Sequence, residues 1–288
     1  MRRVTPQLDH LGECPTWDER TGTFLWINVT GKKLLSCKPD GSEREELTVE
    51  DYPGSFALRE NGGRLVAFRR KIALLNEVGR EVSSHIPDVV AFDKERFNDG
   101  KCDSRGRFWV GTLDKHLQNT VGGLFRVDPD LSVHKMSEGY GISNGIAWSP
   151  DDKTLYHCDS SPTNVYAYDF DAEAGTVGNR RVFVEFEDGV SRPDGCATDS
   201  EGFLWIAAPG AGCIRRYDPD GKLESIVETP SRYPSSIAFG GADLRTLYIT
   251  TLVPHALPPN DGAQPDIDGA LFATEVAVPG LPVGRFGG

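Results

Sequence analysis

The sequence predicts an all-β fold, a six-bladed β-propeller, and two observations lead to this prediction. First, a turn followed by a strand rich in aromatic and aliphatic residues recurs six times along the 288 residues. Second, these units recur every 40 to 50 residues or so, about the length of a four-stranded propeller blade. The six units are DERTGTFLWINV (18–29), RENGGRLVAF (59–68), DSRGRFWVGTL (103–113), SPDDKTLYHCD (149–159), DSEGFLWIAA (199–208) and GGADLRTLYITT (240–251).

A second strand-and-turn segment follows each of these units, as a four-stranded blade requires. These segments are KLLSCKPDGS (33–42), KIALLNEVGRE (71–81), GGLFRVDPDLS (122–132), NVYAYDFDAEAG (164–175), CIRRYDPDGKL (213–223) and GALFATEVAV (269–278). A pair of β-sandwiches would not give six similar units at near-constant spacing, and a β-helix has a shorter repeat. We therefore expect residues 1–288 to form a single six-bladed domain.

The last blade lacks an obvious fourth strand after GALFATEVAV. The N-terminal segment RRVTPQL (2–8) is a candidate for it. Pairing of Arg3–Gln7 with the last blade would close the ring of blades and remove an exposed sheet edge.

Composition and charge exclude several classes of function. The net charge is −12, the pI is near 5.0, and no Lys/Arg cluster forms a stripe, so no nucleic-acid partner is expected. No apolar run approaches the roughly 18 residues of a membrane helix, and no secretory signal is recognisable. The six cysteines form no C-x-x-C pair. They are expected to be buried thiols in a cytoplasmic protein rather than disulfides.

One position in the first strand of the blades is a candidate functional position, because four of the six blades have a carboxylate or an amide there. Four residues before the end of that strand stand Glu13, Gly54, Asn98, Asn144, Asp194 and Ser235. First strands line the channel of a propeller, so these positions are expected to form a ring at one mouth of it. Turn or cap formation would explain any one of the polar residues. Glutamate is a poor turn former, however, and a ring of oxygen donors suits a hard divalent cation such as Ca²⁺, Mg²⁺ or Mn²⁺.

The segment ISNGIAWSPDDKTLY (142–156) tests these alternatives. Taken locally, Asn144-Gly145 between apolar residues indicates a two-residue hairpin. The comparison of blades instead makes SPDDKT the hairpin turn and Asn144 a channel residue. The glycines that follow these positions, Gly100, Gly145 and Gly195, are expected to let the backbone bend sharply.

The segments around these residues resemble a known family. LGECPTWDERTGTFLWINV, ERFNDGKCDSRGRFWVGTL, ISNGIAWSPDDKTLYHCDS and RPDGCATDSEGFLWIA, with the tail GALFATEVAVPGLPVGRF, are similar to senescence marker protein (regucalcin), gluconolactonase and luciferin-regenerating enzyme. The resemblance covers most of the chain. It implies a six-bladed propeller with one divalent metal near its axis and hydrolysis of sugar lactones.

The same resemblance implies roles for individual residues. Glu13, Asn144 and Asp194 would be the metal ligands, Asn98 a substrate contact and outer ligand, and Arg96 a contact to substrate oxygens. Gln118, in the loop DKHLQNTVGG (114–123), stands about where the animal lactonase has a substrate-binding glutamate. Asn28 in LWINV stands where relatives often have aspartate, and the departure matters little if that position is structural.

These residues suggest a metal-dependent lactonase. The cation, which could be Ca²⁺, Zn²⁺, Mn²⁺ or Mg²⁺, would polarise the lactone carbonyl, and Asp194 would be the general base for the attacking water. Asn98 and Arg96 would orient ring hydroxyls. The substrate could be a neutral aldonolactone or an anionic derivative. Arg69 and Arg70 could meet an anionic group, although a solvated surface is the favoured interpretation of both.

Two other functions are weighed against the lactonase. A non-catalytic calcium-binding or scaffold propeller would not need Glu, Asn and Asp together at the channel mouth. A serine hydrolase is disfavoured because Ser143 lies in no G-x-S-x-G motif. The six histidines, at positions 10, 85, 116, 134, 157 and 255, show no metal-ligand spacing. His116 alone lies in the predicted mouth loop. The oligomeric state is not predicted.

Overall fold

The chain forms two compact units built from β-sheets. The computed structural model describes residues 1–254 and 264–288, so His255 lies outside the described residues. The first unit holds Met1–Glu50 and Phe186–Pro282, and the second holds Asp51–Glu185 and Val283–Gly288. No helix occurs in the described residues, and so none that could span a membrane.

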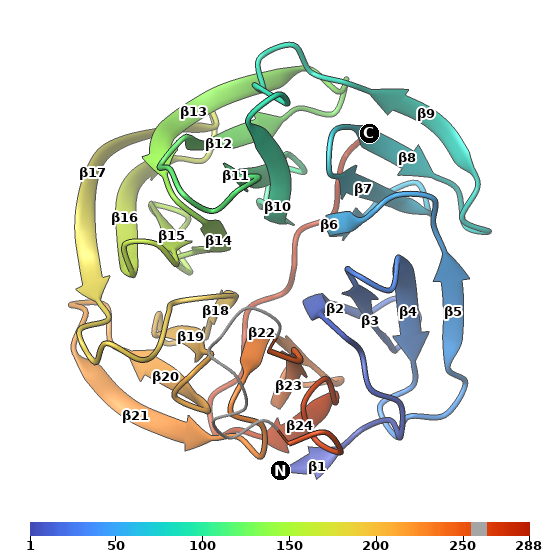
Figure 1. Cartoon of the computed structure of the whole chain (residues 1–288), viewed down its shortest axis with the longest axis vertical. Helices are drawn as coiled ribbons and strands as arrows, with labels where there is room; N and C mark the ends of the chain where they lie inside the picture. The colour runs from blue at the N-terminus through green and yellow to red at the C-terminus, as the bar shows by residue number, and fades with distance from the viewer. Residues whose placement is uncertain (255–263) are drawn as a thin grey trace. The chain divides into compact units, whose positions relative to one another are not determined.

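The first unit contains three four-stranded antiparallel sheets (Figure 1). Their strand orders are β2-β3-β4-β5, β18-β19-β20-β21 and β1-β24-β23-β22. The strands are β1 (Arg2–Arg3), β2 (Gly12–Asp18), β3 (Thr23–Asn28), β4 (Lys33–Cys37), β5 (Glu45–Thr48), β18 (Cys196–Thr198), β19 (Leu204–Ala208), β20 (Cys213–Tyr217), β21 (Leu223–Glu228), β22 (Pro234–Gly240), β23 (Thr246–Thr251) and β24 (Phe272–Glu275).

The second unit also contains three four-stranded antiparallel sheets, each in simple sequence order. The strands are β6 (Pro53–Leu58), β7 (Arg64–Phe68), β8 (Ile72–Leu75), β9 (Glu81–His85), β10 (Glu95–Cys102), β11 (Phe108–Asp114), β12 (Gly122–Val127), β13 (Val133–Tyr140), β14 (Ser143–Trp148), β15 (Thr154–Asp159), β16 (Asn164–Asp171) and β17 (Thr176–Glu185). The six four-stranded sheets are the blades of a six-bladed β-propeller, which confirms the predicted fold class.

The predicted turns join the first and second strands of the blades. In SPDDKT, the Ser149 N–H donates to the Thr154 carbonyl at 2.9 Å, and the Asp152 N–H donates to the Ser149 carbonyl at 3.0 Å. This segment is therefore the hairpin between β14 and β15, as predicted, and Asn144 and Gly145 lie within β14.

The N-terminus supplies the outer strand of the last blade. Arg2 pairs with Ala273 and Arg3 with Phe272, and the Val4 N–H donates to the Leu271 carbonyl at 2.8 Å. The predicted pairing is confirmed for a shorter segment than Arg3–Gln7, because the chain leaves the sheet after Val4.

Each unit has apolar cores between neighbouring sheets. In the second unit, Leu65, Phe97, Phe108 and Phe125 pack between the β6–β9 and β10–β13 sheets. All six cysteines are buried and none forms a disulfide, which confirms that prediction. Burial of a leucine or phenylalanine side chain in these cores contributes about 1.5–3 kcal/mol to folding.

A tryptophan–aspartate–arginine cluster occurs in two blades, at the turn that precedes the second strand. Trp109 Nε1 donates to Asp103 Oδ2 at 2.9 Å, and Arg107 pairs with the same oxygen at 2.7 Å. The blade of β18–β21 repeats the arrangement with Trp205, Asp199 and Arg216. Asp103 in DSRGRFW and Asp199 in DSEGFLW thus each accept hydrogen bonds from a buried indole and a buried guanidinium, which explains why these turns recur.

The C-terminal residues complete the second unit. Phe286 is fully buried in the core beside Phe97 and Phe108. Its N–H donates to the Leu58 carbonyl at 2.8 Å and its carbonyl accepts from the Glu60 N–H at 2.9 Å. The chain therefore returns to the second unit after leaving it at Glu185.

Replacing Asp103 by alanine should lower the free energy of unfolding by about 3–5 kcal/mol, because Arg107 and Trp109 would keep buried polar atoms without their partner. Urea denaturation measures this difference. Asp130→Ala is the matched control, since Asp130 also caps a turn, accepting the Ser132 N–H, but is exposed. Equal stability of the two variants would contradict the assigned role of Asp103.

Candidate active site

Glu13, Asn98 and Asn144 lie at β-bulges in the first strands of their blades, whereas Asp194 precedes β18, which pairs regularly with β19. Ser143 pairs with Asp159 and Ile146 with His157, so β14 holds one residue more than β15 over this step. The same irregularity occurs at 13–16 in β2, 53–55 in β6, 97–100 in β10 and 234–236 in β22. A bulge turns a side chain out of the regular alternation of a strand, and bulges are frequent beside active sites.

In the second unit, Asn98 and Asn144 lie in direct contact. Asn98 Nδ2 donates to Asn144 Oδ1 at 2.6 Å and to the Ser143 carbonyl at 2.9 Å. On its other side, the Asn98 carbonyl accepts from Ser55 Oγ at 2.8 Å. The predicted neighbourhood of these two positions is therefore present within this unit.

The end of the second strand fixes the side chain of Asn144. Asn144 Nδ2 donates to Ser160 Oγ at 2.7 Å, so the amide oxygen is the atom that faces Asn98. Asp159, fully buried, accepts the N–H groups of Gly141, Ile142 and Ser161. Burial raises the pKa of the Asp159 carboxyl, although these hydrogen bonds act in the opposite direction. The side chain of Asn144 and the backbone before it are thus both held by the end of β15 and the residue that follows it.

A buried serine–histidine pair lies behind Asn144. Ser143 Oγ and His157 Nε2 are 2.6 Å apart, both side chains are fully buried, and Tyr140 packs edge-on against the imidazole. Burial lowers the pKa of His157 to about 3, so the ring is neutral. Its Nδ1 has no hydrogen-bond partner in the described part of the chain, and hence no orienting carboxylate. This pair supports the bulge and lacks the geometry of a serine-hydrolase dyad.

Arg96 lies at the start of β10, next to the asparagine pair. Its Nη1 donates to the Phe97 carbonyl at 3.1 Å and to Asn98 Oδ1 at 3.4 Å. Burial lowers the pKa of the Arg96 guanidinium, and the positive charge of Arg69 lowers it further. Arg96 makes no ion pair with any residue that the structure describes.

Glu13 and Asp194 lie in the first unit. Asp194 is buried and Glu13 half-buried. The Gly195 N–H donates to the Ser235 carbonyl at 2.9 Å, and Ser235 Oγ donates to the Gly12 carbonyl at 2.5 Å. In the first unit, the segment of Asp194 is therefore hydrogen-bonded to that of Ser235, and the segment of Ser235 to that of Glu13. The segments of Gly54, Asn98 and Asn144 are linked in the same way in the second unit.

The expected reason was wrong for Gly100 and Gly195. Gly195 has no positive φ, and a Cβ built there would lie 1.9 Å from Ser236 Oγ. At Gly100 a Cβ would lie 2.5 Å from the Phe108 ring. Both glycines are required by the close approach of a neighbour rather than by a sharp bend.

Gln118 lies in an exposed loop after β11. Asp114, at the end of that strand, accepts the N–H groups of His116, Gln118 and Asn119. These hydrogen bonds, the one from His116 first, lower the pKa of the Asp114 carboxyl to about 2. The Gln118 side chain forms no hydrogen bond within the described residues, so its predicted contact with a substrate stays a prediction.

The predicted metal ligands mix carboxylates with an amide. Within residues 1–254 and 264–288, no group of three or more His, Cys, Asp or Glu side chains could hold a metal ion. A set of two carboxylates, from Glu13 and Asp194, and one amide oxygen, from Asn144, is compatible with that finding. The donation from Asn144 to Ser160 leaves the Asn144 oxygen to accept from Asn98. Carboxylate and amide oxygens are donor types that suit a hard divalent cation.

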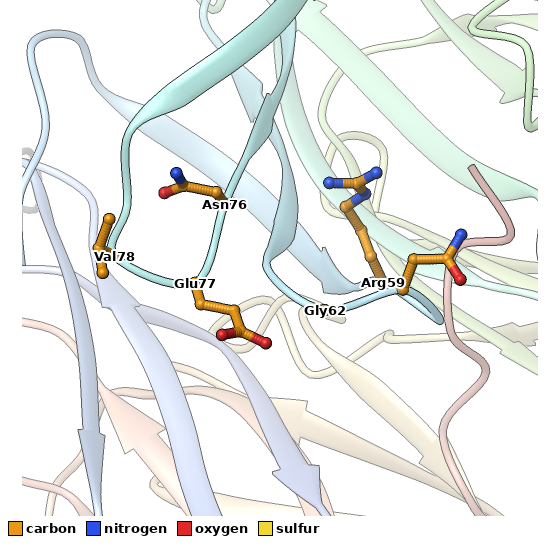
Figure 2. A pocket seen from close by; sticks show the side chains of 6 residues that line it. Arg59, Gly62, Asn76, Glu77 and Val78 are labelled. Atoms are coloured by element: carbon orange, nitrogen blue, oxygen red, sulfur yellow. The ribbon is translucent and has the colours of Figure 1, made fainter.

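A surface pocket of about 350 Å³ lies elsewhere in the second unit (Figure 2). Arg59 and Gly62 line it from the β6–β7 turn, and Asn76, Glu77 and Val78 line it from the β8–β9 turn. These turns lie at the opposite end of β6 from Gly54, so this pocket is separate from the candidate site.

The sequence did not identify the residues that support the site. Asp159, Ser160 and His157 hold Asn144 and Ser143 in place, and their roles depend on the pairing of β14 with β15. The polar run HCDSS (157–161) at the end of a buried strand was the sequence feature that could have identified them. Asn28 has a similar structural role, because its amide oxygen accepts the Gly31 N–H at 3.0 Å and its amide nitrogen donates to Asp9 at 3.1 Å.

The buried imidazole of His157 should make stability depend on pH. Below pH 6.5 the unfolded chain binds a proton at this residue that the folded chain, with a pKa of about 3, does not bind. Its contribution is thus complete above pH 6.5 and is lost at about 1.4 kcal/mol per pH unit as the pH falls toward 3. Urea titrations from pH 7 to pH 4 should show a shallower slope for His157→Gln than for the wild type. The exposed His134→Gln should keep the wild-type slope, and equal slopes for all three proteins would show that the His157 imidazole is not held neutral by burial.

The comparisons with known proteins show the family of the chain. The family model described as "SMP-30/Gluconolactonase/LRE-like region" matches residues 11–253. A 6-deoxy-6-sulfogluconolactonase of Pseudomonas putida is 37% identical over 100% of this chain and 99% of its own. Regucalcin of Xenopus laevis is 35% identical over 99% of this chain and 97% of its own. Among solved structures, the calcium-binding protein regucalcin from Agrobacterium tumefaciens superposes with a TM-score of 0.88 at 26% identity, covering 99% of this chain and 97% of that one. The chain therefore belongs to the SMP-30/gluconolactonase/LRE-like family.

Proposed function

We propose that this chain is a divalent-metal-dependent lactonase that opens a sugar lactone to the corresponding aldonic acid. The observation that carries the proposal is the asparagine pair at the bulges of β10 and β14, with the Asn144 oxygen oriented by Ser160. Membership of the family and the name of the Pseudomonas putida relative support a lactone as substrate.

Glu13, Asn144 and Asp194 would hold the cation. Ca²⁺, Zn²⁺, Mn²⁺ and Mg²⁺ are all candidates, because oxygen donors of this kind select among them by availability. When bound, the cation polarises the lactone carbonyl and stabilises negative charge on its oxygen.

The residues of the chain perform the rest of the reaction. The Asp194 carboxylate accepts a proton from the attacking water, whose oxygen bonds to the carbonyl carbon. The bond from that carbon to the ring oxygen then breaks, and the ring oxygen takes up the proton to become a hydroxyl. Asn98 and Arg96 orient the substrate, and the Gln118 loop contributes to the choice of sugar.

Replacement of Asp194 by asparagine should lower kcat by about 10²–10⁴-fold, because the general base is lost while the shape of the side chain is kept. A pH-indicator assay with gluconolactone measures the rate. Asp220→Asn, at an exposed turn of the first unit, is the control and should behave as the wild type. Normal turnover by Asp194→Asn would refute the assignment.

Removal of divalent ions should abolish lactone hydrolysis. Treatment with EDTA followed by dialysis is expected to leave no enzymatic rate, and addition of Ca²⁺, Zn²⁺, Mn²⁺ or Mg²⁺ should restore it to different extents. The same ions should raise the melting temperature, since a ligand at 100 times its Kd stabilises the folded state by about 2.7 kcal/mol. Full activity after EDTA treatment would exclude the metal-dependent mechanism.

A further inference from the structure

Exposed apolar side chains gather at the outermost strand of one blade in the second unit. β9 is the last strand in the order β6-β7-β8-β9, so one of its edges pairs with no strand that the structure describes (Figure 1). Four of the eleven large apolar side chains that are exposed in the described residues lie between positions 78 and 89. They are Val78, Val82, Ile86 and Val89, with exposed fractions of 80%, 57%, 61% and 46%. Such a gathering is typical of a surface that binds a protein.

The edge of β9 lacks the basic residues that commonly protect an open edge. Natural sheets place lysine and other charged residues on exposed edges, where they prevent pairing with another chain. The outer strand β13 contains Lys135, and the outer strand β17 contains two arginines. Positions 81–89 contain no lysine or arginine, and Glu81 is already paired with Lys71 at 2.6 Å. The free edge of β9 is therefore able to accept another strand.

The sequence of this edge is complementary to itself in antiparallel order. When Ser84 of one copy lies opposite Ser84 of a second copy, Val82 of each copy comes opposite Ile86 of the other. In the same register, Arg80 of each copy comes opposite Asp88 of the other. Arg80 and Asp88 are both exposed, and neither forms an ion pair within residues 1–254 and 264–288. Apolar pairs near the centre and opposite charges at both ends suit a two-fold symmetric interface.

We propose that two copies of this chain form a two-fold symmetric dimer in which their β9 strands pair in antiparallel order, centred on Ser84. The β6–β9 sheets of the two copies then join into one continuous sheet, and the open edge of each is covered. Two copies with a net charge of −12 each repel one another, so a register that pairs Arg80 with Asp88 is favoured over registers without attractive charges. β6, which carries Gly54, is the strand farthest from β9 in the sheet, so the dimer leaves the candidate site open.

Sedimentation equilibrium of the full chain measures this association. Between about 1 µM and about 300 µM, which brackets the Kd of a small interface, the mass of the wild type should rise from the 31.5 kDa of one chain toward twice that value. Val82→Lys places a charge opposite Ile86 and should weaken the association at least about tenfold. The matched control is Val182→Lys, because Val182 is a half-exposed valine in another outer strand, and it should keep the wild-type Kd. A wild type that stays monomeric throughout, or a dimer that Val82→Lys leaves unchanged, would overturn the proposal.

Exchange of charges tests the register. Arg80→Asp and Asp88→Arg each convert two attractive pairs into two repulsive ones, so each variant should self-associate at least about tenfold more weakly than the wild type. An equimolar mixture of these two variants should dimerise about as tightly as the wild type, because every charge then meets its opposite. The double variant Arg80→Asp/Asp88→Arg should regain the wild-type Kd for the same reason. A loss of association that neither the mixture nor the double variant restores would overturn the register. Neither measurement needs turnover, so both outcomes are independent of the proposed lactonase function.

Discussion

The extra residue in the first strand of five of the six blades is the constraint on which the candidate site depends. A regular strand would direct alternate side chains to opposite faces and would pack Asn98 and Asn144 like their neighbours. The bulges at 97–100 and 143–146 break the alternation where β10 and β14 begin, so that the two amides meet at 2.6 Å. Gly100 at the first of these bulges permits the close approach of the Phe108 ring. The site therefore depends first on the path of the backbone and only then on its side chains.

The second strands hold these irregular segments in place. Asp159 binds the backbone before Asn144, Asp114 binds the loop that contains Gln118, and Asn28 binds the turn after β3. All three stand at the last residue of a second strand, opposite the first residues of the first strand. Polar residues at this register position therefore stiffen the ends of the three blades that carry Glu13, Asn98 and Asn144, which favours a preorganised site over one formed on binding.

The sequence predicted the fold better than the site because the fold depends on local signals. Turns such as SPDDKT, and the strands that follow them, are defined by neighbouring residues. The six blades, and even the pairing of Arg2–Arg3 with the last blade, could therefore be predicted from the sequence. The position shared by Glu13, Asn98, Asn144 and Asp194 was accessible because the repeat aligns it. The bulges were not, since an extra residue appears only against the register of the partner strand. For the same reason Asp159, Ser160 and the Ser143–His157 pair went unrecognised, and the close approach at Gly195 was mistaken for a bend.

The return of the C-terminal residues to the second unit has a consequence for biosynthesis. The ribosome delivers 51–185 early, but the core of that unit lacks Phe286 until the last few residues have emerged. The first unit must likewise wait for 186–282 before 1–50 find their partners. The first unit cannot reach its final packing before residue 282 is made, nor the second before residue 286, so both depend on contacts between residues far apart in sequence, which form slowly. The nascent protein therefore carries a second unit with an unfilled core until Phe286 has been made, and a first unit in which β1 lacks its partner β24.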